Sequence, residues 1–342
     1  APAKTHKEME SNNGIEVKDF AYCSDKYQYT MGKSFYETGR KDVIAVFNMF
    51  YRKAPENNNW AVVSGIEEAI ECIRNLGKAE PEFYEKFLPG DEYSEFRKYL
   101  STLKFTGNVY AMREGEIAFP NQPIITVEAP LIEAQILETP LLCIMNHQMA
   151  VATKASRVCR ATNRPVSEFG SRRAHGPWAA TYGAKAAIIA GCASTSNILT
   201  GVLNGVPSTG DGHSFVTSYG STVEGEHKAF VDYIGTHKGE NLILLIDTYD
   251  TLKCGILNAI RSFKECGIDN EYPNGYGVRL DSGDLAYLSV KVRRILDNHG
   301  LTGCKIFATN SLDEYLISDL ERQGACIDSY GVGDAIATSK AA

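Results

Sequence analysis

Charged and hydroxyl side chains gather at the end of the apolar stretch GYGVRL, residues 275–280. Arg279 lies within this stretch, and Asp281, Ser282 and Asp284 follow it. An arginine fork binds two phosphate oxygens at once, and aspartates are ligands that Mg²⁺ favours. The pattern is therefore typical of a site for a phosphorylated, metal-bound substrate. Taken alone, the turn is explained better by a surface ion pair beside an aspartate that caps a helix.

A second acidic turn follows the apolar run LILLI at residues 242–246 and contains Asp247 and Asp250. Runs of this kind are typical of buried parallel strands, and the loops after the carboxyl ends of such strands build the ligand site. Two acidic turns in neighbouring strand–helix units favour a cation site over a purely solubilising role.

Two later turns, SLDE and GVGD, offer backbone amides that could bind an anion. Ser311 and Glu314 have the spacing of a capping box, which predicts a helix N-terminus at Ser311. Gly331 and Gly333 form a short glycine turn. A lone glycine pair is usually only a turn, but in the last of a row of strand–helix units it is typical of the phosphate-binding corner of a barrel.

The segment FGSRRAHG places Phe169 beside Arg172 and Arg173 at the end of another predicted strand. A ring next to a guanidinium suits a flat, anionic, aromatic ligand, because the ring stacks and the guanidinium binds the carboxylate. A core phenylalanine with solvated arginines explains these residues equally well.

His213 lies among glycines and a serine in GDGHSFV, after a valine-containing stretch that predicts a short strand. At the edge of a sheet, a histidine with such small neighbours could act as a nucleophile, with clearance for a γ-phosphate. On the histidine's own evidence, a loop histidine at the surface is the better explanation.

The elements that must position these residues alternate between strand and helix in the second half of the chain. Such repetition indicates a parallel sheet with the site at the carboxyl ends of its strands. We predict an α/β protein in which residues 151–342 form an irregular TIM-like β/α barrel. Residues 1–150 form an N-terminal α+β domain with a β-rich piece near 105–130. A long helical pattern is interrupted at Pro140, which marks either a kink or a boundary.

Composition excludes several classes of protein. A net charge of −7 without a basic stripe argues against nucleic-acid binding. The nine cysteines are scattered without a CxxC pair, which is typical of reduced thiols in a cytoplasmic protein. The polar N-terminus does not form a signal peptide, and the apolar runs are too short to span a membrane. We expect a soluble, cytoplasmic protein.

Together these motifs resemble the nicotinate phosphoribosyltransferase family. The resemblance is carried by FPNQPIITVEAPLIEAQILETPLL, EFGSRRAHG, HSFV, LLIDTYDT, GVRLDSGDL and ATNSLDE, and extends from about Tyr22 to Ser339. It implies a type II phosphoribosyltransferase fold and a pentosyl-transferring enzyme of NAD salvage. Such an enzyme joins nicotinate to phosphoribosyl pyrophosphate, gives nicotinate mononucleotide and pyrophosphate, and couples the reaction to ATP hydrolysis as a ligase does.

The resemblance also implies roles for single residues. His213 matches the histidine that ATP phosphorylates, and Phe169 matches the ring that stacks on the pyridine. Tyr27 matches a tyrosine supplied to the opposite ring face by the neighbouring subunit, so a homodimer with shared sites is expected. Arg172 matches the arginine near the pyridine carboxylate. Asn197 stands where nicotinamide enzymes carry an aspartate, which would repel that carboxylate.

The remaining matches concern the phosphates. Asp247 and Asp281 match acids around the ribose, the pyrophosphate and Mg²⁺, and Arg279 matches a phosphate-binding arginine. The 5′-phosphate cradle would be formed by Ser311, Gly331 and Gly333. The implied cofactor is Mg²⁺, and ATP is the implied energy-coupling co-substrate.

Two residues and the chain end depart from the family's pattern. Asp211 adds a negative charge near His213, and Asp334 replaces a frequent threonine. Because the chain stops at SKAA, we expect part of the C-terminal barrel to be missing. The alternatives are nicotinamide phosphoribosyltransferase and a non-catalytic relative that binds ligand only. A sugar-phosphate lyase would need a Schiff-base lysine at a strand end, and neither Lys253 nor Lys305 occupies one.

Overall fold

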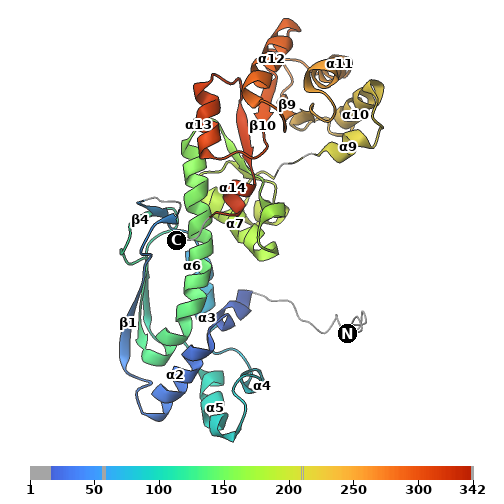
Figure 1. Cartoon of the computed structure of the whole chain (residues 1–342). Helices are drawn as coiled ribbons and strands as arrows, with labels where there is room; N and C mark the ends of the chain where they lie inside the picture. The colour runs from blue at the N-terminus through green and yellow to red at the C-terminus, as the bar shows by residue number, and fades with distance from the viewer. Residues whose placement is uncertain (1–16, 56–58, 209, 211, 340–342) are drawn as a thin grey trace. The chain divides into compact units, whose positions relative to one another are not determined.

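The computed structural model describes residues 17–55, 59–208, 210 and 212–339. These residues fall into two compact units, one ending at Ala150 and the other beginning at Val151. Helix α6 (Leu131–Arg160), the long green helix of Figure 1, begins in the first unit and ends in the second. Each unit is organised by its own β-sheet, and the two sheets share no strand.

The first unit is organised by a three-stranded antiparallel sheet in the order β1–β5–β3. Its strands are β1 (Ile44–Met49), β3 (Asn108–Ala111) and β5 (Ile125–Pro130), and β2 (Ala61–Val62) pairs separately with β4 (Ile117–Ala118). In β5, Ile125, Val127 and Ala129 are buried and the residues between them are half-buried. This alternation is what the two-residue period of a strand produces when one face meets a core.

Helices supply the rest of that core. They are η1 (Val17–Tyr22), α2 (Lys26–Glu37), α3 (Ile66–Arg74), α4 (Pro81–Glu85), η3 (Asp91–Tyr93) and α5 (Ser94–Thr102). Tyr84, Phe96 and Leu137 are among the buried side chains that join helices and sheet in one cluster. The first unit therefore buries its own apolar core.

Pro140 lies inside α6, and the helix continues through it. A proline cannot donate to the carbonyl four residues before it, which here belongs to Ile136. The hydroxyl of Ser24 donates to this carbonyl oxygen at 3.2 Å and replaces the missing bond. The alternative that Pro140 marks a boundary between elements is therefore wrong.

The second unit contains six parallel strands in the order β7–β6–β11–β10–β9–β8. They are β6 (Val166–Glu168), β7 (Ser194–Thr195), β8 (Leu242–Leu245), β9 (Tyr276–Leu280), β10 (Lys305–Ala308) and β11 (Ser329–Val332). All five residues of β9 are buried, as expected for a parallel strand covered on both faces. The order leaves β7 and β8 at opposite edges, and the part of the chain described here contains no pairing between them. The predicted β/α barrel is thus present as a curled half-barrel.

Helices connect these strands. They are η4 (Ser171–Arg173), α7 (Pro177–Ile189), α8 (Ile198–Asn204), α9 (His213–Thr217), α10 (Val223–Thr236), the π-helix η5 (Thr251–Gly255), α11 (Ile256–Glu265), α12 (Leu285–Asn298), α13 (Glu314–Arg322) and α14 (Asp334–Ala337). Among the residues described in both units, every helix is too short or too polar to cross a membrane. All nine cysteines are free in this structure.

The strand predicted just before His213 is wrong. In its place Ser208 forms a single parallel bridge with Thr195, and Asp211 lies outside the described residues. The segment contains Pro207, which has no N–H to donate to a ladder, and it follows Gly205, whose φ of 64° ends α8 in a left-handed turn. These two residues disfavour a strand at the start of this segment.

Gly255 allows the π-helix to pass close to the end of β8. A Cβ at this position would lie 1.8 Å from the carbonyl oxygen of Ile246, the residue before Asp247. We therefore expect Gly255→Ala to lower the free energy of unfolding by about 3 kcal/mol, because backbone atoms must move to admit the methyl group. Urea unfolding followed by circular dichroism measures this change.

Gly235→Ala is the matched control, since Gly235 lies in helix α10 and no atom would come within 4 Å of its new Cβ. Alanine in a helix interior is expected to raise stability by up to about 1 kcal/mol. Equal stabilities of the two variants would contradict the steric argument for Gly255.

Candidate active site

The candidate site residues of the second unit follow the carboxyl ends of neighbouring strands. Arg279 is the fourth residue of β9, and Asp281 comes directly after this strand. Asp247 follows β8, Thr309 follows β10 and Phe169 follows β6. Because the strands are parallel and adjacent, these side chains emerge at the carboxyl-terminal end of the sheet.

Arg279, Asp281 and Thr309 form a compact charged cluster at this end of the sheet. Arg279 is 8% exposed, and its Nη2 lies 3.2 Å from Oδ1 of Asp281. Its Nε donates to the hydroxyl of Thr309 at 2.9 Å, and that hydroxyl donates in turn to Oδ1 of Asp281. A buried guanidinium is thereby balanced by a carboxylate and by hydrogen bonds.

The same cluster determines the charge of Asp281. Burial opposes its ionisation, but the hydrogen bond from Thr309 and the charge of Arg279 outweigh burial and hold the pKa of this carboxyl below its ordinary value. Asp281 is therefore an anion at neutral pH. The opposite charges of Arg279 and Asp281 remain paired there.

Asp247 lies beside Asp281, and only one of its two carboxylate oxygens accepts hydrogen bonds from the described residues. Its Oδ2 accepts hydrogen bonds from the amide of Asp281 at 3.2 Å and from the hydroxyl of Ser282 at 2.5 Å. Its Oδ1 is buried and has no hydrogen-bond partner among the described residues. A buried carboxylate oxygen without a partner is costly, so this atom is suited to a cation or to a ligand hydroxyl.

His213 joins this cluster although no strand precedes it. It is the first residue of α9, a helix of five residues, and its side chain is 41% exposed. Its Nε2 lies 3.5 Å from Oδ2 of Asp281, and its Nδ1 lies 3.2 Å from the hydroxyl of Thr248. Each ring nitrogen therefore has one polar neighbour, a carboxylate at Nε2 and a hydroxyl at Nδ1.

Phe169 is a further neighbour of Arg279. The guanidinium carbon of Arg279 is 5.8 Å from the centroid of the phenylalanine ring, within the range of a cation–π contact. The amide of Phe169 donates to the carbonyl of Val332 at 2.8 Å. A Cβ on Gly331 would lie 2.8 Å from the ring and 2.6 Å from Thr309, so only glycine lets the ring and Thr309 sit against this strand.

Glu168 holds the turn that carries Phe169. This carboxylate is 2% exposed and accepts hydrogen bonds from the amide of Gly170 and, at 2.6 Å, from the hydroxyl of Thr195. Burial raises its pKa, although these two donors lower it in part. Glu168 thus ties the end of β6 to β7.

Arg172 and Asn197 lie at that same end of the half-barrel. Arg172 is exposed in η4. Asn197 caps α8, because its Oδ1 accepts from the amide of Thr200 at 2.9 Å, and its Nδ2 donates to the hydroxyl of Ser171 at 3.0 Å. The asparagine therefore fixes the turn that presents Arg172.

Two acidic residues of the sequence hypothesis are helix caps. Asp250 accepts from the amides of Leu252 and Lys253 at the start of η5, and the hydrogen bond from the Lys253 amide is the largest cause of its lowered pKa. Asp284 accepts from the amide of Tyr287 at the start of α12. The capping explanation offered for the turn after β9 is correct for Asp284, and Asp250 is a cap that the sequence did not predict, whereas Asp247 and Asp281 lie at the cluster.

The capping box predicted at Ser311 and Glu314 is wrong. Asp313 caps α13 instead, with its carboxylate accepting from the amides of Tyr315 and Leu316. Ser311 lies two residues earlier in a left-handed turn with φ of 50°. Glu314 is buried and forms ion pairs with two cations of α6, namely Lys154 and Arg157. Ser311 therefore lies before the N-terminus of α13 and does not cap it. Gly333 lies directly before α14.

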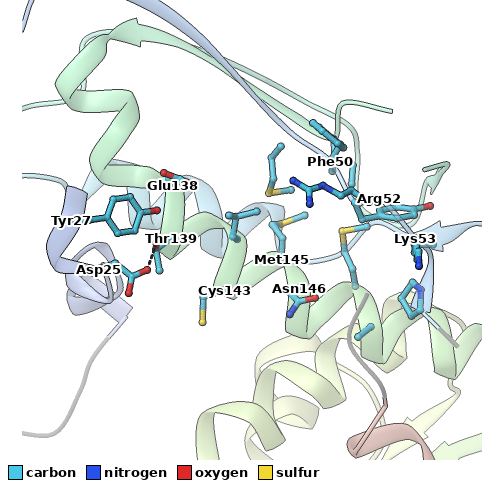
Figure 2. A pocket seen from close by; sticks show the side chains of 18 residues that line it. Asp25, Tyr27, Phe50, Arg52, Lys53, Glu138, Thr139, Cys143, Met145 and Asn146 are labelled. Carbon is cyan, nitrogen blue, oxygen red and sulfur yellow. Dashed lines mark hydrogen bonds between the residues drawn. The ribbon is translucent and has the colours of Figure 1, made fainter. Parts of the chain in front are cut away.

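Tyr27 belongs to the first unit and lines a cavity of about 790 Å³ in it (Figure 2). The ring is 46% exposed at the start of α2. Asp25 next to it accepts a hydrogen bond from Thr139 of α6 at 2.7 Å. Two cations, Arg52 and Lys53, line the same cavity.

Sequence reasoning missed three polar residues of the second unit: Thr309, Thr248 and Glu168. Thr309 directly follows β10, Glu168 ends β6, and Thr248 comes three residues after β8, so all three lie near the end of a strand, as Asp281 does. They were overlooked because hydroxyls and a lone glutamate suggest no particular ligand on their own.

Comparison with known proteins identifies the family of this chain. Residues 23–146 match the family described as nicotinate phosphoribosyltransferase (NAPRTase) N-terminal domain. Nicotinate phosphoribosyltransferase of Bacillus subtilis is 43% identical over 330 residues, which cover 95% of this chain and 65% of that protein. One from Mycobacterium tuberculosis is 33% identical over 350 residues, which cover 100% of this chain and 73% of that protein. The chain belongs to the nicotinate phosphoribosyltransferase family.

A solved structure extends the likeness to the fold. The crystal structure of human nicotinic acid phosphoribosyltransferase superimposes with a TM-score of 0.81 at 28% identity, covering 91% of this chain and 72% of that one. The predicted family and fold class are therefore confirmed. The chain spans 65% of the length of its Bacillus relative.

Proposed function

We propose that the protein is a nicotinate phosphoribosyltransferase, which joins nicotinate to phosphoribosyl pyrophosphate and releases pyrophosphate. The observation that carries the proposal is the cluster of Arg279, Asp281, Asp247 and His213 beside Phe169 at one end of the sheet. Departure of pyrophosphate leaves positive charge at C1 of the ribose, so catalysis needs positioning and electrostatic stabilisation more than covalent chemistry. A buried arginine, two carboxylates and a ring supply these.

We assign the substrate contacts residue by residue. Arg279 binds phosphate oxygens of phosphoribosyl pyrophosphate, and the ring of Phe169 stacks on the pyridine. Arg172 attracts the pyridine carboxylate, and the neutral Asn197 does not repel it. The 5′-phosphate cradle is formed by Ser311, Gly331 and Gly333.

Of the two carboxylates in this cluster, Asp247 is better suited to bind Mg²⁺ than Asp281. Oδ1 of Asp247 is buried without a partner, whereas both oxygens of Asp281 already face other side chains. The described residues contain no group of three His, Cys, Asp or Glu side chains that could hold a metal. This agrees with the way Mg²⁺ is usually bound to phosphorylated substrates, through one or two carboxylates and the phosphates themselves. When bound, the ion would neutralise the charge of the leaving pyrophosphate.

ATP coupling is assigned to His213, whose ring is accessible and next to Asp281. We propose that one ring nitrogen attacks the γ-phosphorus of ATP, with ADP leaving, and that the phosphohistidine is hydrolysed during turnover. Tyr27 is assigned to the site of a neighbouring subunit, which makes the active form a homodimer. A cytoplasmic location stays a prediction.

The test is pyrophosphate release from phosphoribosyl pyrophosphate with nicotinate, nicotinamide or quinolinate as the second substrate. We expect release with nicotinate alone. Release with nicotinamide would favour the sibling enzyme. Binding of nicotinate without pyrophosphate release would identify a non-catalytic relative.

A further inference from the structure

Thr309 is an uncharged residue that joins two charged members of the cluster, Arg279 and Asp281. It is 3% exposed and follows β10, and its amide donates to the carbonyl of Leu280 in β9 at 2.9 Å. Its hydroxyl accepts from Nε of Arg279 at 2.9 Å and donates to Oδ1 of Asp281. Its methyl carbon faces Gly331, where a Cβ would come within 2.6 Å. The backbone and the side chain of Thr309 are thus both held in place by contacts.

The direction of these hydrogen bonds is determined by chemistry. A guanidinium only donates, so the threonine oxygen must accept from Arg279. The single proton of the hydroxyl is then available for a hydrogen bond to Asp281, whose carboxylate accepts it. Nη2 of Arg279 also contacts Oδ1 of Asp281 directly at 3.2 Å, so each of the three residues contacts the other two. Removal of the hydroxyl would leave Nε of Arg279 buried without this acceptor.

We propose that Thr309 is a positioning residue for the phosphorylated substrate: its hydroxyl fixes the orientation of Arg279 relative to Asp281. The inference rests on the proposed function. Thr309 acts through Arg279 and Asp281 and not by contact with the pyridine. Its loss should therefore affect the use of phosphoribosyl pyrophosphate more than the apparent affinity for nicotinate.

Two variants separate the hydroxyl from the shape of the side chain. Thr309→Val keeps the methyl group against Gly331 and removes the hydroxyl, whereas Thr309→Ser keeps the hydroxyl and removes the methyl group. Hydrogen bonds to charged groups support an expected loss of about 30-fold in kcat/KM for phosphoribosyl pyrophosphate in Thr309→Val. Thr309→Ser should stay within about threefold of the wild type, and KM for nicotinate should change little in either variant.

Steady-state pyrophosphate release, with each substrate varied in turn, measures these effects, and melting temperatures show that both variants fold. The inference is overturned if Thr309→Val retains kcat/KM, or if Thr309→Ser loses as much. If the wild type releases no pyrophosphate, the proposed function fails separately. The variants are then compared by the rise in melting temperature that phosphoribosyl pyrophosphate produces. Equal rises for wild type and Thr309→Val would again overturn the positioning role.

Discussion

His213→Ala should remove the stimulation of pyrophosphate release by ATP while leaving a basal reaction. The imidazole is partly exposed, 3.5 Å from Asp281 and 3.2 Å from Thr248, and is the group that we propose ATP phosphorylates. Alanine cannot accept a phosphate, so addition of ATP should change the variant's rate by less than about twofold. Basal activity should persist because Arg279, Asp247 and Phe169 remain in place. Rates with and without ATP, and transfer of label from the γ-phosphate of ATP to the protein, measure the effect.

His299→Ala provides the control. His299 is exposed at the end of α12, where its Nδ1 contacts only the carbonyl of Ile295 at 2.9 Å. This variant should be stimulated by ATP and labelled like the wild type. If His213→Ala responded to ATP as the wild type does, the phosphohistidine assignment would be wrong, although the transferase assignment would stand.

Arg279→Lys should lower kcat/KM for phosphoribosyl pyrophosphate by about 100-fold. Lysine keeps the charge but offers a single ammonium in place of a rigid fork. It cannot reach Thr309, Asp281 and a substrate phosphate in one geometry, and a displaced buried charge costs several kcal/mol. Pyrophosphate release measures the loss. Arg279→Met, which removes the charge, should in addition lower the melting temperature because Asp281 loses its partner.

Arg261→Lys is the matched control for this exchange. Arg261 pairs with Glu224 at 3.0 Å on the surface, where both side chains are more than half exposed. Exposed ion pairs contribute little, so its activity and melting temperature should equal those of the wild type. Retention of kcat/KM within about threefold in Arg279→Lys would contradict the fork-like phosphate contact.

Elements with a continuous apolar pattern were predictable from the sequence. LILLI and GYGVRL became β8 and β9, and the residues after them, Asp247 and Asp281, emerged where parallel strands end. Burial on both faces leaves such strands few alternatives. The half-barrel and the acidic part of the cluster were therefore accessible to sequence reasoning.

Local competition explains the errors. Two residues able to cap a helix, Ser311 and Asp313, lie two positions apart, and Asp313 caps α13 because its carboxylate accepts from two amides at once. Thr309 was missed for another reason. Its partners lie 28 and 30 residues away along the chain, so nothing near it in the sequence shows that its hydroxyl bridges two charges.

These separations have a consequence for how the protein acquires activity during folding. The bond between His213 and Thr248 closes 35 residues, and those of Thr309 close about 30. Apart from the pair Arg279 and Asp281 at the end of β9, the contacts described for the cluster join residues from different elements. The cluster forms only when β8, β9, β10 and β11 have paired in register, and parallel pairing of distant segments is slow. Helix content should therefore return early on refolding, and catalytic competence last.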